Sequence, residues 1–213
     1  HLDFIDSGAE VIVTNSFGSR RRRLIENNLQ KKYAQLNKLA GSLAKKAVTI
    51  SKKNILIAGS LPPQNLTYIA DLGRDKKFIK SGFKSQAKYL NPYVDFFYLD
   101  VMSSYEECKI GIESIKNYKK EVLVGIHLRK NDRLPSGEKF LDVVKKIEST
   151  IKVFKPNIIY THHPSDLNID HTIVHRAVIT AARPIPNSSI KKILMFEIMS
   201  STNWSTKFLK PQY

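Results

Sequence analysis

Residues 161–171, THHPSDLNIDH, bring together side chains that bind metals or move protons. Three are histidines, two are aspartates and one is an asparagine. Zinc is commonly bound by imidazole and carboxylate groups, with three or four protein ligands at one site. His175 lies one helical turn after His171 and adds a further donor on spacing alone. The segment is therefore a candidate metal site; the alternative for His162 and His163 is bonding to nearby backbone only.

Polar residues follow five short apolar runs of the chain. They are Asn15 after VIVT, Gly59-Ser60 after ILIA, Asp100 after FFYL, His127 after VLVGI and His162-His163 after IIYT. In parallel α/β folds, ligands bind where the strands end at their carboxyl side. We therefore expect these residues to line one edge of a sheet. The alternative for each is a turn or a helix cap, and for Asp100 a cap of the helix that begins near Ser103.

The elements that must position these residues alternate along the chain. Strands are expected at the β-branched runs Val11–Thr14, Ile55–Ala58, Phe96–Leu99, Leu123–Ile126, Ile158–Thr161 and Ile193–Phe196. Helices are expected at the amphipathic stretches 22–50, 82–91, 104–118, 138–153 and 171–183. This alternation predicts an α/β fold with parallel strands and right-handed crossovers.

The composition excludes several classes of protein. The 213 residues are 42% hydrophobic, which is ordinary for a globular domain. No apolar run approaches the roughly 20 residues of a membrane span, and no signal-peptide pattern opens the chain. The single cysteine, Cys108, excludes an internal disulfide framework and favours a cytoplasmic location. Because the chain starts at His1 rather than Met, we expect an upstream part.

The net charge of +16 raises the question of a nucleic-acid partner. The lysines are dispersed along the whole chain, and no aromatic residues are interleaved with them in a binding motif. The one cluster, Arg20–Arg23, opens a helical stretch and is expected to form a solvated helix face, with a phosphate contact as the alternative. Nucleic acid is therefore an unlikely partner, and a membrane is not expected.

Four segments in order, HLDFIDSGAEVIVTNSFGS, IAGSLPP, NPYVDFFYLDVMSS and GIHLRKNDRLPSGE, resemble homocysteine S-methyltransferase domains. The resemblance covers residues 1–147 and implies the second to fifth strands of a TIM barrel. It also implies methyl transfer from a donor such as S-methylmethionine to homocysteine, whose thiolate is activated on zinc. By the same resemblance, Asn15 and Asp100 line the homocysteine pocket.

The chain departs from this family in three places. Asp100-Val101-Met102 stands where the family has Glu followed by Thr, so the carboxylate sits one methylene short. The three cysteines that hold the family's zinc have no counterpart, and Cys108 lies in a helical stretch as an ordinary helix cysteine. The family's opening strand is missing too. We therefore expect an incomplete and inactive transferase.

A second resemblance begins near residue 147. The run FKPNIIYTHHPSDLNIDHTIVHRAVITAARPIP, followed by FEIMSSTNW, is similar to the C-terminal part of PIG-L/LmbE-type deacetylases of N-acetylglucosamine-containing substrates. This resemblance implies that His171 is a zinc ligand, that Asp166 and Asn168 line the sugar side, and that Asp170 is the catalytic position that orients its neighbours. The family's His-Pro-Asp-Asp-Glu motif, which supplies the other ligands, does not occur in the chain.

The two resemblances divide the chain into residues 1–147 and 148–213 and meet inside one amphipathic stretch without a linker. They predict a partial TIM barrel that runs into a Rossmann-like segment. Three functions stay open: a homocysteine S-methyltransferase-like protein, a zinc-dependent deacetylase, and a non-catalytic chimeric remnant. Both enzyme families imply zinc and a small-molecule partner, either homocysteine with its methyl donor or an N-acetylated amino sugar.

Overall fold

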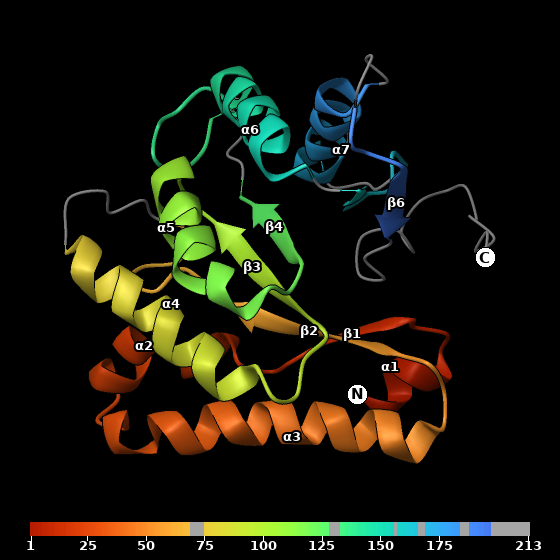
Figure 1. Cartoon of the computed structure of the whole chain (residues 1–213). Helices are drawn as coiled ribbons and strands as arrows, with labels where there is room; N and C mark the ends of the chain where they lie inside the picture. Colours follow the sequence, from red (N-terminus) through yellow and green to blue (C-terminus); the bar gives the residue numbers. More distant parts are fainter. Residues whose placement is uncertain (69–74, 128–132, 156, 166–168, 184–187, 197–213) are drawn as a thin grey trace. The chain divides into compact units, whose positions relative to one another are not determined.

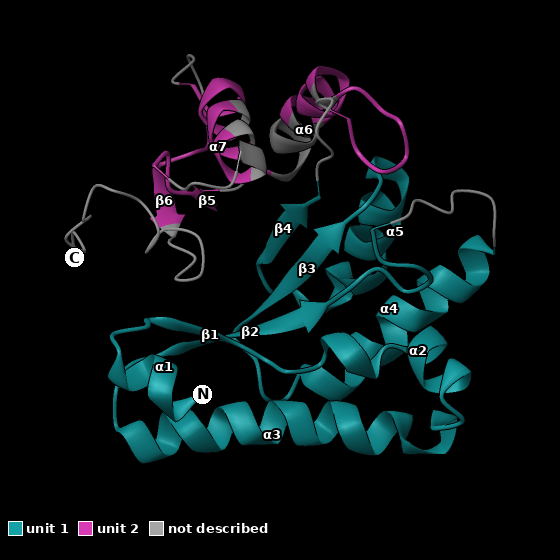
Figure 2. Cartoon of the chain, turned by 180° about the vertical axis from the view of Figure 1, so that it is seen from behind, with its two compact units in different colours: residues 1–127 teal, residues 128–213 magenta. Residues whose placement is uncertain are grey.

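The computed structural model describes residues 1–68, 75–127, 133–155, 157–165, 169–183 and 188–196 (Figure 1). The chain divides into two compact units, residues 1–127 and residues 128–213 (Figure 2). In both units the described strands pair in parallel and alternate with helices. The predicted parallel α/β fold class is therefore confirmed.

Unit 1 is built on a four-stranded parallel sheet. Its strands are β1 (Val11–Val13), β2 (Leu56–Leu61), β3 (Phe96–Met102) and β4 (Val122–Ile126). They pair in the order β1-β2-β3-β4, which is also their order in the sequence. Sequential parallel order is that of a (β/α) barrel wall, whereas a doubly wound sheet reverses its order at a switch point.

The helices of unit 1 follow the strands along the chain. They are α1 (Leu2–Asp6), η1 (Phe17–Ser19), α2 (Arg21–Glu26), η2 (Gln30–Lys32), α3 (Tyr33–Ser51), α4 (Lys76–Leu90), α5 (Tyr105–Ile115) and η3 (Lys116–Tyr118). Figure 1 shows α3, α4 and α5 along one side of the sheet. Their apolar faces meet the strands in one core, in which Phe83 of α4 and Phe97 of β3 are fully buried. Burying such a side chain contributes roughly 1.5–3 kcal/mol.

The alternation along β3 separates a core face from a site face. Phe97 and Leu99 are fully buried in the core between sheet and helices, whereas Tyr98 and Asp100 are only partly buried. Because successive strand residues point to opposite faces, Tyr98 and Asp100 lie on the face of the sheet away from these helices. The fold thus places Asp100 on the side that a barrel encloses.

A β-bulge interrupts β3 at Asp100. Leu99 pairs with Val124 and Met102 with Ile126, so that three steps along β3 match two along β4. The extra residue allows Val101 a φ of +57°, which a β-branched residue rarely adopts. Bulges re-aim side chains next to binding sites. This bulge sets the direction of the strand end that carries Asp100.

The sequence-based boundaries need three corrections in unit 1. Helix α4 begins at Lys76, six residues before the helix expected over 82–91. The single helix expected over 22–50 is two helices, because the chain reverses at Asn28, whose φ is +56°. Ser60, expected just after a strand, lies inside β2. Asp100 caps no helix; instead Ser104 caps α5 by accepting a hydrogen bond from the Glu107 amide at 3.1 Å.

Unit 2 contains a pair of parallel strands and two helices among its described residues. They are α6 (Phe140–Phe154), β5 (Ile158–His162), α7 (Ile169–Ala181) and β6 (Lys192–Phe196). The strands β5 and β6 pair in register from Ile158 opposite Lys192 to His162 opposite Phe196. Helix α7 packs against β5 and α6. The four elements agree with those expected from the sequence.

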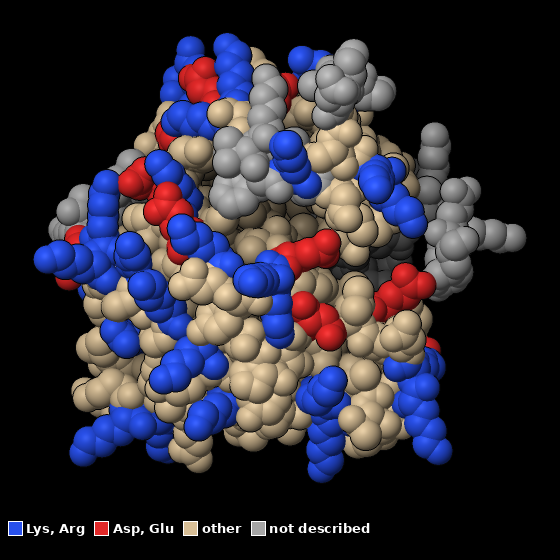
Figure 3. Space-filling model, in the orientation of Figure 1, with Lys and Arg blue, Asp and Glu red and all other residues tan. Residues whose placement is uncertain are grey.

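The positive charges are dispersed over the surface, as the sequence predicts. Lys and Arg side chains are spread over α3 and α4 in Figure 3 and do not gather in one stripe. Among the described residues, no helix combines the length and the apolar character that a membrane crossing requires.

Candidate substrate-binding site

Asp100 lies at the centre of a polar cluster on the site face of the sheet. Its Oδ2 atom accepts a hydrogen bond from the Ser60 hydroxyl at 3.0 Å, and its side chain is also hydrogen-bonded to Tyr98. Burial raises the pKa of Asp100, while both hydrogen bonds act in the opposite direction. Burial and the neighbouring Asp100 likewise raise the pKa of Tyr98. An ionised carboxylate accepts about four hydrogen bonds, so Asp100 keeps acceptor capacity for a cationic ligand group.

Ser60 connects Asp100 to the segment after β1. The Ser60 amide donates to the Thr14 hydroxyl at 3.0 Å, and the Ser16 hydroxyl donates to the Ser60 carbonyl at 2.8 Å. Asn15 stands between Thr14 and Ser16 in the turn that follows β1, and its side chain is exposed. The backbone on both sides of Asn15 is thus held by hydrogen bonds to Ser60 of β2, and Ser60 also donates to Asp100 of β3.

His127 follows β4 at the same end of the sheet. Its backbone amide donates to the Met102 carbonyl at 2.9 Å. Its ring meets that of Tyr68 edge-on, with 5.0 Å between the ring centroids. Asn15, Ser60, Asp100 and His127 therefore mark what we call the carboxyl edge of the sheet. Four of the five expected strand ends belong to one sheet; the fifth, at His162, belongs to unit 2.

A buried chain of amides, which was not expected from the sequence, supports this edge. Gln64 donates through Nε2 to Gln86 Oε1 at 2.9 Å, and Gln86 donates to Asn37 Oδ1 and to the Ser16 carbonyl, each at 3.0 Å. Asn37 donates to the Ser19 carbonyl at 3.1 Å. Glu107 ends the chain, because its Oε1 accepts the Gln64 amide at 2.9 Å. Burial raises the pKa of Glu107 to about 7.

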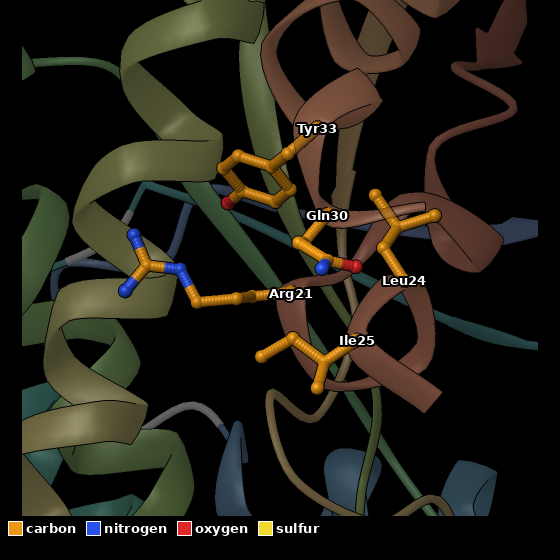
Figure 4. Close-up of a pocket in the computed structure, with 5 residues that line it drawn as sticks. All are labelled: Arg21, Leu24, Ile25, Gln30 and Tyr33. Carbon is orange, nitrogen blue, oxygen red and sulfur yellow. The ribbon is translucent and has the colours of Figure 1, made fainter. Parts of the chain in front are cut away.

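The arginine cluster Arg20–Arg23 is only in part the solvated face expected from the sequence, because Arg23 is exposed and Arg22 partly exposed, whereas the other two are engaged inside unit 1. Arg20 is buried, and Arg21 donates to the hydroxyls of Ser81 at 3.1 Å and Ser85 at 3.3 Å on α4. Figure 4 shows the Arg21 guanidinium directed toward α4 beside a pocket of about 280 Å³. Its lining residues are Arg21, Leu24, Ile25, Gln30 and Tyr33. None of the residues predicted for a site lines this pocket.

Three histidines lie together in unit 2. The rings of His162 and His171 stack with centroids 4.1 Å apart, and the His175 Nδ1 atom is 2.9 Å from the His162 carbonyl oxygen. His163 accepts the Ser165 amide at 3.2 Å, which is the local backbone contact named as its alternative role. Asp166 and Asn168 lie outside the described residues. Asp170 lies in α7, but its side chain is outside the described part of the chain.

A zinc ion does not fit the residues that the structure describes. Within them, no group of three or more His, Cys, Asp or Glu side chains is placed to hold a metal. Cys108 is buried in the core of unit 1, and burial raises the pKa of its thiol to about 12. Zinc binds the deprotonated sulfur. Cys108 therefore does not replace the family's cysteine ligands, and the assignment of His171 as a metal ligand stays a prediction.

Comparisons with known proteins agree with the geometry of unit 1. The structure is similar to the apo crystal structure of the homocysteine methyltransferase MmuM from Escherichia coli, with a TM-score of 0.61, 15% sequence identity and coverage of 95% of this chain and 80% of that one. At this identity the likeness shows the fold alone. No curated protein matches the sequence. The model of the homocysteine S-methyltransferase family matches residues 1–162, past the predicted boundary near residue 147. The chain belongs to the homocysteine S-methyltransferase family.

Proposed function

We propose that unit 1 binds homocysteine at the carboxyl edge of its sheet. In this proposal Asp100 accepts hydrogen bonds from the amino group of homocysteine, and Asn15 lines the pocket. The observation that supports it most is the position of Asp100 at a bulged strand end, hydrogen-bonded to Ser60. Membership of the family makes a small-molecule substrate of this class the natural ligand.

The hydrogen bonds of Asp100 suit this role. Two neutral hydroxyl donors give the Asp100 carboxyl group a fixed direction, and its oxygens still have lone pairs for an ammonium group. A cationic partner would lower the pKa of Asp100 that burial raises.

We further propose that this 213-residue chain binds the amino acid without transferring a methyl group to it. The methyl acceptor is the sulfur of homocysteine, which must be a thiolate and which the family activates on zinc held by three cysteines. The chain offers one cysteine, which is buried in the core. The described residues also bring no three metal donors together. Without zinc, the thiol of bound homocysteine stays mostly protonated at neutral pH, and a protonated thiol is a poor nucleophile.

Calorimetric titration with L-homocysteine tests the binding proposal. We expect saturable binding to the wild-type chain and no methionine formation above the uncatalysed rate when S-methylmethionine and zinc are added. Turnover of zinc-loaded protein would contradict the second proposal and leave the first intact. A chain that binds no homocysteine would contradict the first.

The histidines of unit 2 support a second candidate function. The stacked pair His162 and His171, with His175 bonded to the His162 carbonyl, gathers imidazoles at the motif that resembles a PIG-L/LmbE-type deacetylase. In this proposal His171 binds zinc, Asp166 and Asn168 contact the sugar, and Asp170 orients the neighbouring groups. The reaction would be the hydrolysis of an N-acetyl group from an amino sugar.

Metal analysis separates the second candidate from a remnant. If His171 is a ligand, the wild-type chain retains zinc through dialysis and His171→Ala loses it. His163→Ala is the matched control, because His163 is bonded only within its own turn in the described structure. Equal zinc content in all three proteins, together with no acetate release from N-acetylglucosamine derivatives, would exclude the deacetylase.

A further inference from the structure

Arg20 is a buried cation, and two of its three guanidinium nitrogens have no hydrogen-bond partner among the described residues. Its side chain belongs to a residue only 5% exposed, and neither Nε nor Nη1 has a partner among the described residues. The ring of Phe17 lies beside it, with the guanidinium carbon 5.8 Å from the ring centroid. Burying an unpaired charge is costly, and charged groups in protein interiors are normally paired. Within the part of the chain that the structure describes, no anion is therefore paired with the Arg20 guanidinium.

Two acidic residues, Glu26 and Glu107, act electrostatically on Arg20, and neither supplies the anion. Glu26 is paired with Arg22 at 2.7 Å. Glu107 interacts electrostatically with Arg20, but no ion pair joins the two among the described residues, and Glu107 Oε1 is engaged by the Gln64 amide at 2.9 Å. Burial also raises the pKa of Glu107 to about 7, so near neutral pH this carboxyl is only partly ionised. Arg20 keeps its charge and its donors.

Arg20 is held at the end of the sheet where ligands bind. Arg20, Gln64 and Glu107 lie in the segments that follow β1, β2 and β3. The amide chain fixes the segment of Arg20 at two points, since Gln86 donates to the Ser16 carbonyl and Asn37 donates to the Ser19 carbonyl. A guanidinium that neighbouring bonds hold in place loses little freedom when it binds. The backbone that carries these donors is thus held in place before a ligand binds.

We propose that Arg20 binds the carboxylate of a small-molecule ligand at the carboxyl edge. This inference rests on the proposed function, in which the ligand is homocysteine and the carboxylate is its α-carboxylate. The planar guanidinium fork matches a carboxylate with two parallel hydrogen bonds. Arg20 would then bind the anionic end of the amino acid and Asp100 its cationic end, which selects a zwitterion over a simple thiol.

Arg20→Gln tests this proposal against the control Arg22→Gln. Both changes remove one positive charge, but Arg22 lies partly exposed on α2, where it pairs with Glu26 at 2.7 Å. We measure the affinity of homocysteine, of 3-aminopropanethiol, which lacks the carboxylate, and of 4-mercaptobutyrate, which lacks the amino group. Loss of a charged hydrogen bond weakens binding by about tenfold or more. We expect this loss for homocysteine and 4-mercaptobutyrate in Arg20→Gln and no loss in Arg22→Gln.

The outcomes separate this inference from the proposed function. If Arg20→Gln binds homocysteine as tightly as wild type does, the inference is overturned and the proposed function stands. If 4-mercaptobutyrate binds in an Arg20-dependent way while homocysteine does not bind, the proposed function fails and the inference stands. If no carboxylate ligand depends on Arg20, the inference is overturned.

A stability measurement keeps the proposal testable if the glutamine variant fails to fold. Arg20→Met keeps the apolar stem of the side chain and removes the unpaired charge. We expect the ligand-free Arg20→Met protein to melt at a higher temperature than wild type, because the buried charge has no compensating bond. A lower melting temperature would show that Arg20 is a structural residue and would overturn the proposal.

Discussion

Glu107 illustrates how burial sets the chemistry of one side chain near the candidate site. Its pKa rises from its ordinary 4.5 to about 7, because burial outweighs both the Gln64 hydrogen bond and the charge of Arg20. The folded state therefore holds a proton on Glu107 between these pH values, whereas the unfolded chain has released it. Ionising Glu107 costs stability as the pH rises.

We predict that the free energy of unfolding decreases between pH 4.5 and about 7 through Glu107. One pKa unit corresponds to 1.36 kcal/mol, so the loss amounts to about 3 kcal/mol across this range. Glu107→Gln removes this component, and urea titrations at pH 5 and pH 8 compare the two proteins. An identical pH dependence in wild type and variant would contradict the assignment.

Val101 is strained at its φ of +57°, directly after Asp100. A left-handed backbone costs an L-residue roughly 1–2 kcal/mol, and glycine adopts it freely. We predict that Val101→Gly raises the free energy of unfolding by about 1 kcal/mol in denaturant titrations. Val13→Gly is the control, because Val13 lies in β1 outside the positive-φ residues. Val13→Gly should lower the free energy of unfolding by roughly 0.5–1 kcal/mol. A comparable loss in both variants would exclude strain at Val101.

At the scale of the elements, periodicity located every described strand and most helices. The β-branched runs coincide with β1 to β6 within a few residues, because such runs have few alternatives in a buried parallel sheet. The break between α2 and α3 was missed, although Asn27-Asn28 signals it, since asparagine tolerates the left-handed φ that Asn28 adopts. The bulge in β3 depends on pairing with β4 and leaves no local pattern.

The polar site was harder to predict than the elements. Asn15, Asp100 and His127 were found because they follow apolar runs. The amide chain was not, because Gln86 and Asn37 look like surface residues of amphipathic helices. One signal did exist: Asn37 shares the buried face of α3 with Tyr33, Ala40 and Ala44. A polar residue on a core face predicts a buried hydrogen-bond partner.

Helix α3 approaches its neighbours closely through Gly41. A Cβ atom there would lie 2.6 Å from the Tyr93 ring and 2.9 Å from the Tyr93 Cβ. We predict that Gly41→Ala lowers the free energy of unfolding by about 1–2 kcal/mol, since overpacking outweighs the better helix propensity of alanine. Gly18→Ala, with nothing within 4 Å, should change it by less than about 0.5 kcal/mol. Thermal melts of both variants check this, and a stabilised Gly41→Ala would contradict the packing.

At the scale of the whole molecule, the end of the family match and the boundary between the two units fall at different residues. The family match covers residues 1–162 and so includes unit 1 and part of unit 2. The residues that we propose for homocysteine binding all lie in unit 1, and the histidines of the second candidate all lie in unit 2. The two proposals therefore rest on different residues and are tested by different variants.

The most direct test of the proposed function is homocysteine binding to Asp100→Asn. This change keeps the shape of the side chain and removes the negative charge that we assign to the substrate's amino group. Calorimetry should show that Asp100→Asn binds homocysteine about tenfold or more weakly than wild type does, which corresponds to the loss of one charged hydrogen bond. Asp3→Asn, the same change on the exposed face of α1, should bind as wild type does. Equal affinity in Asp100→Asn and Asp3→Asn would contradict the account.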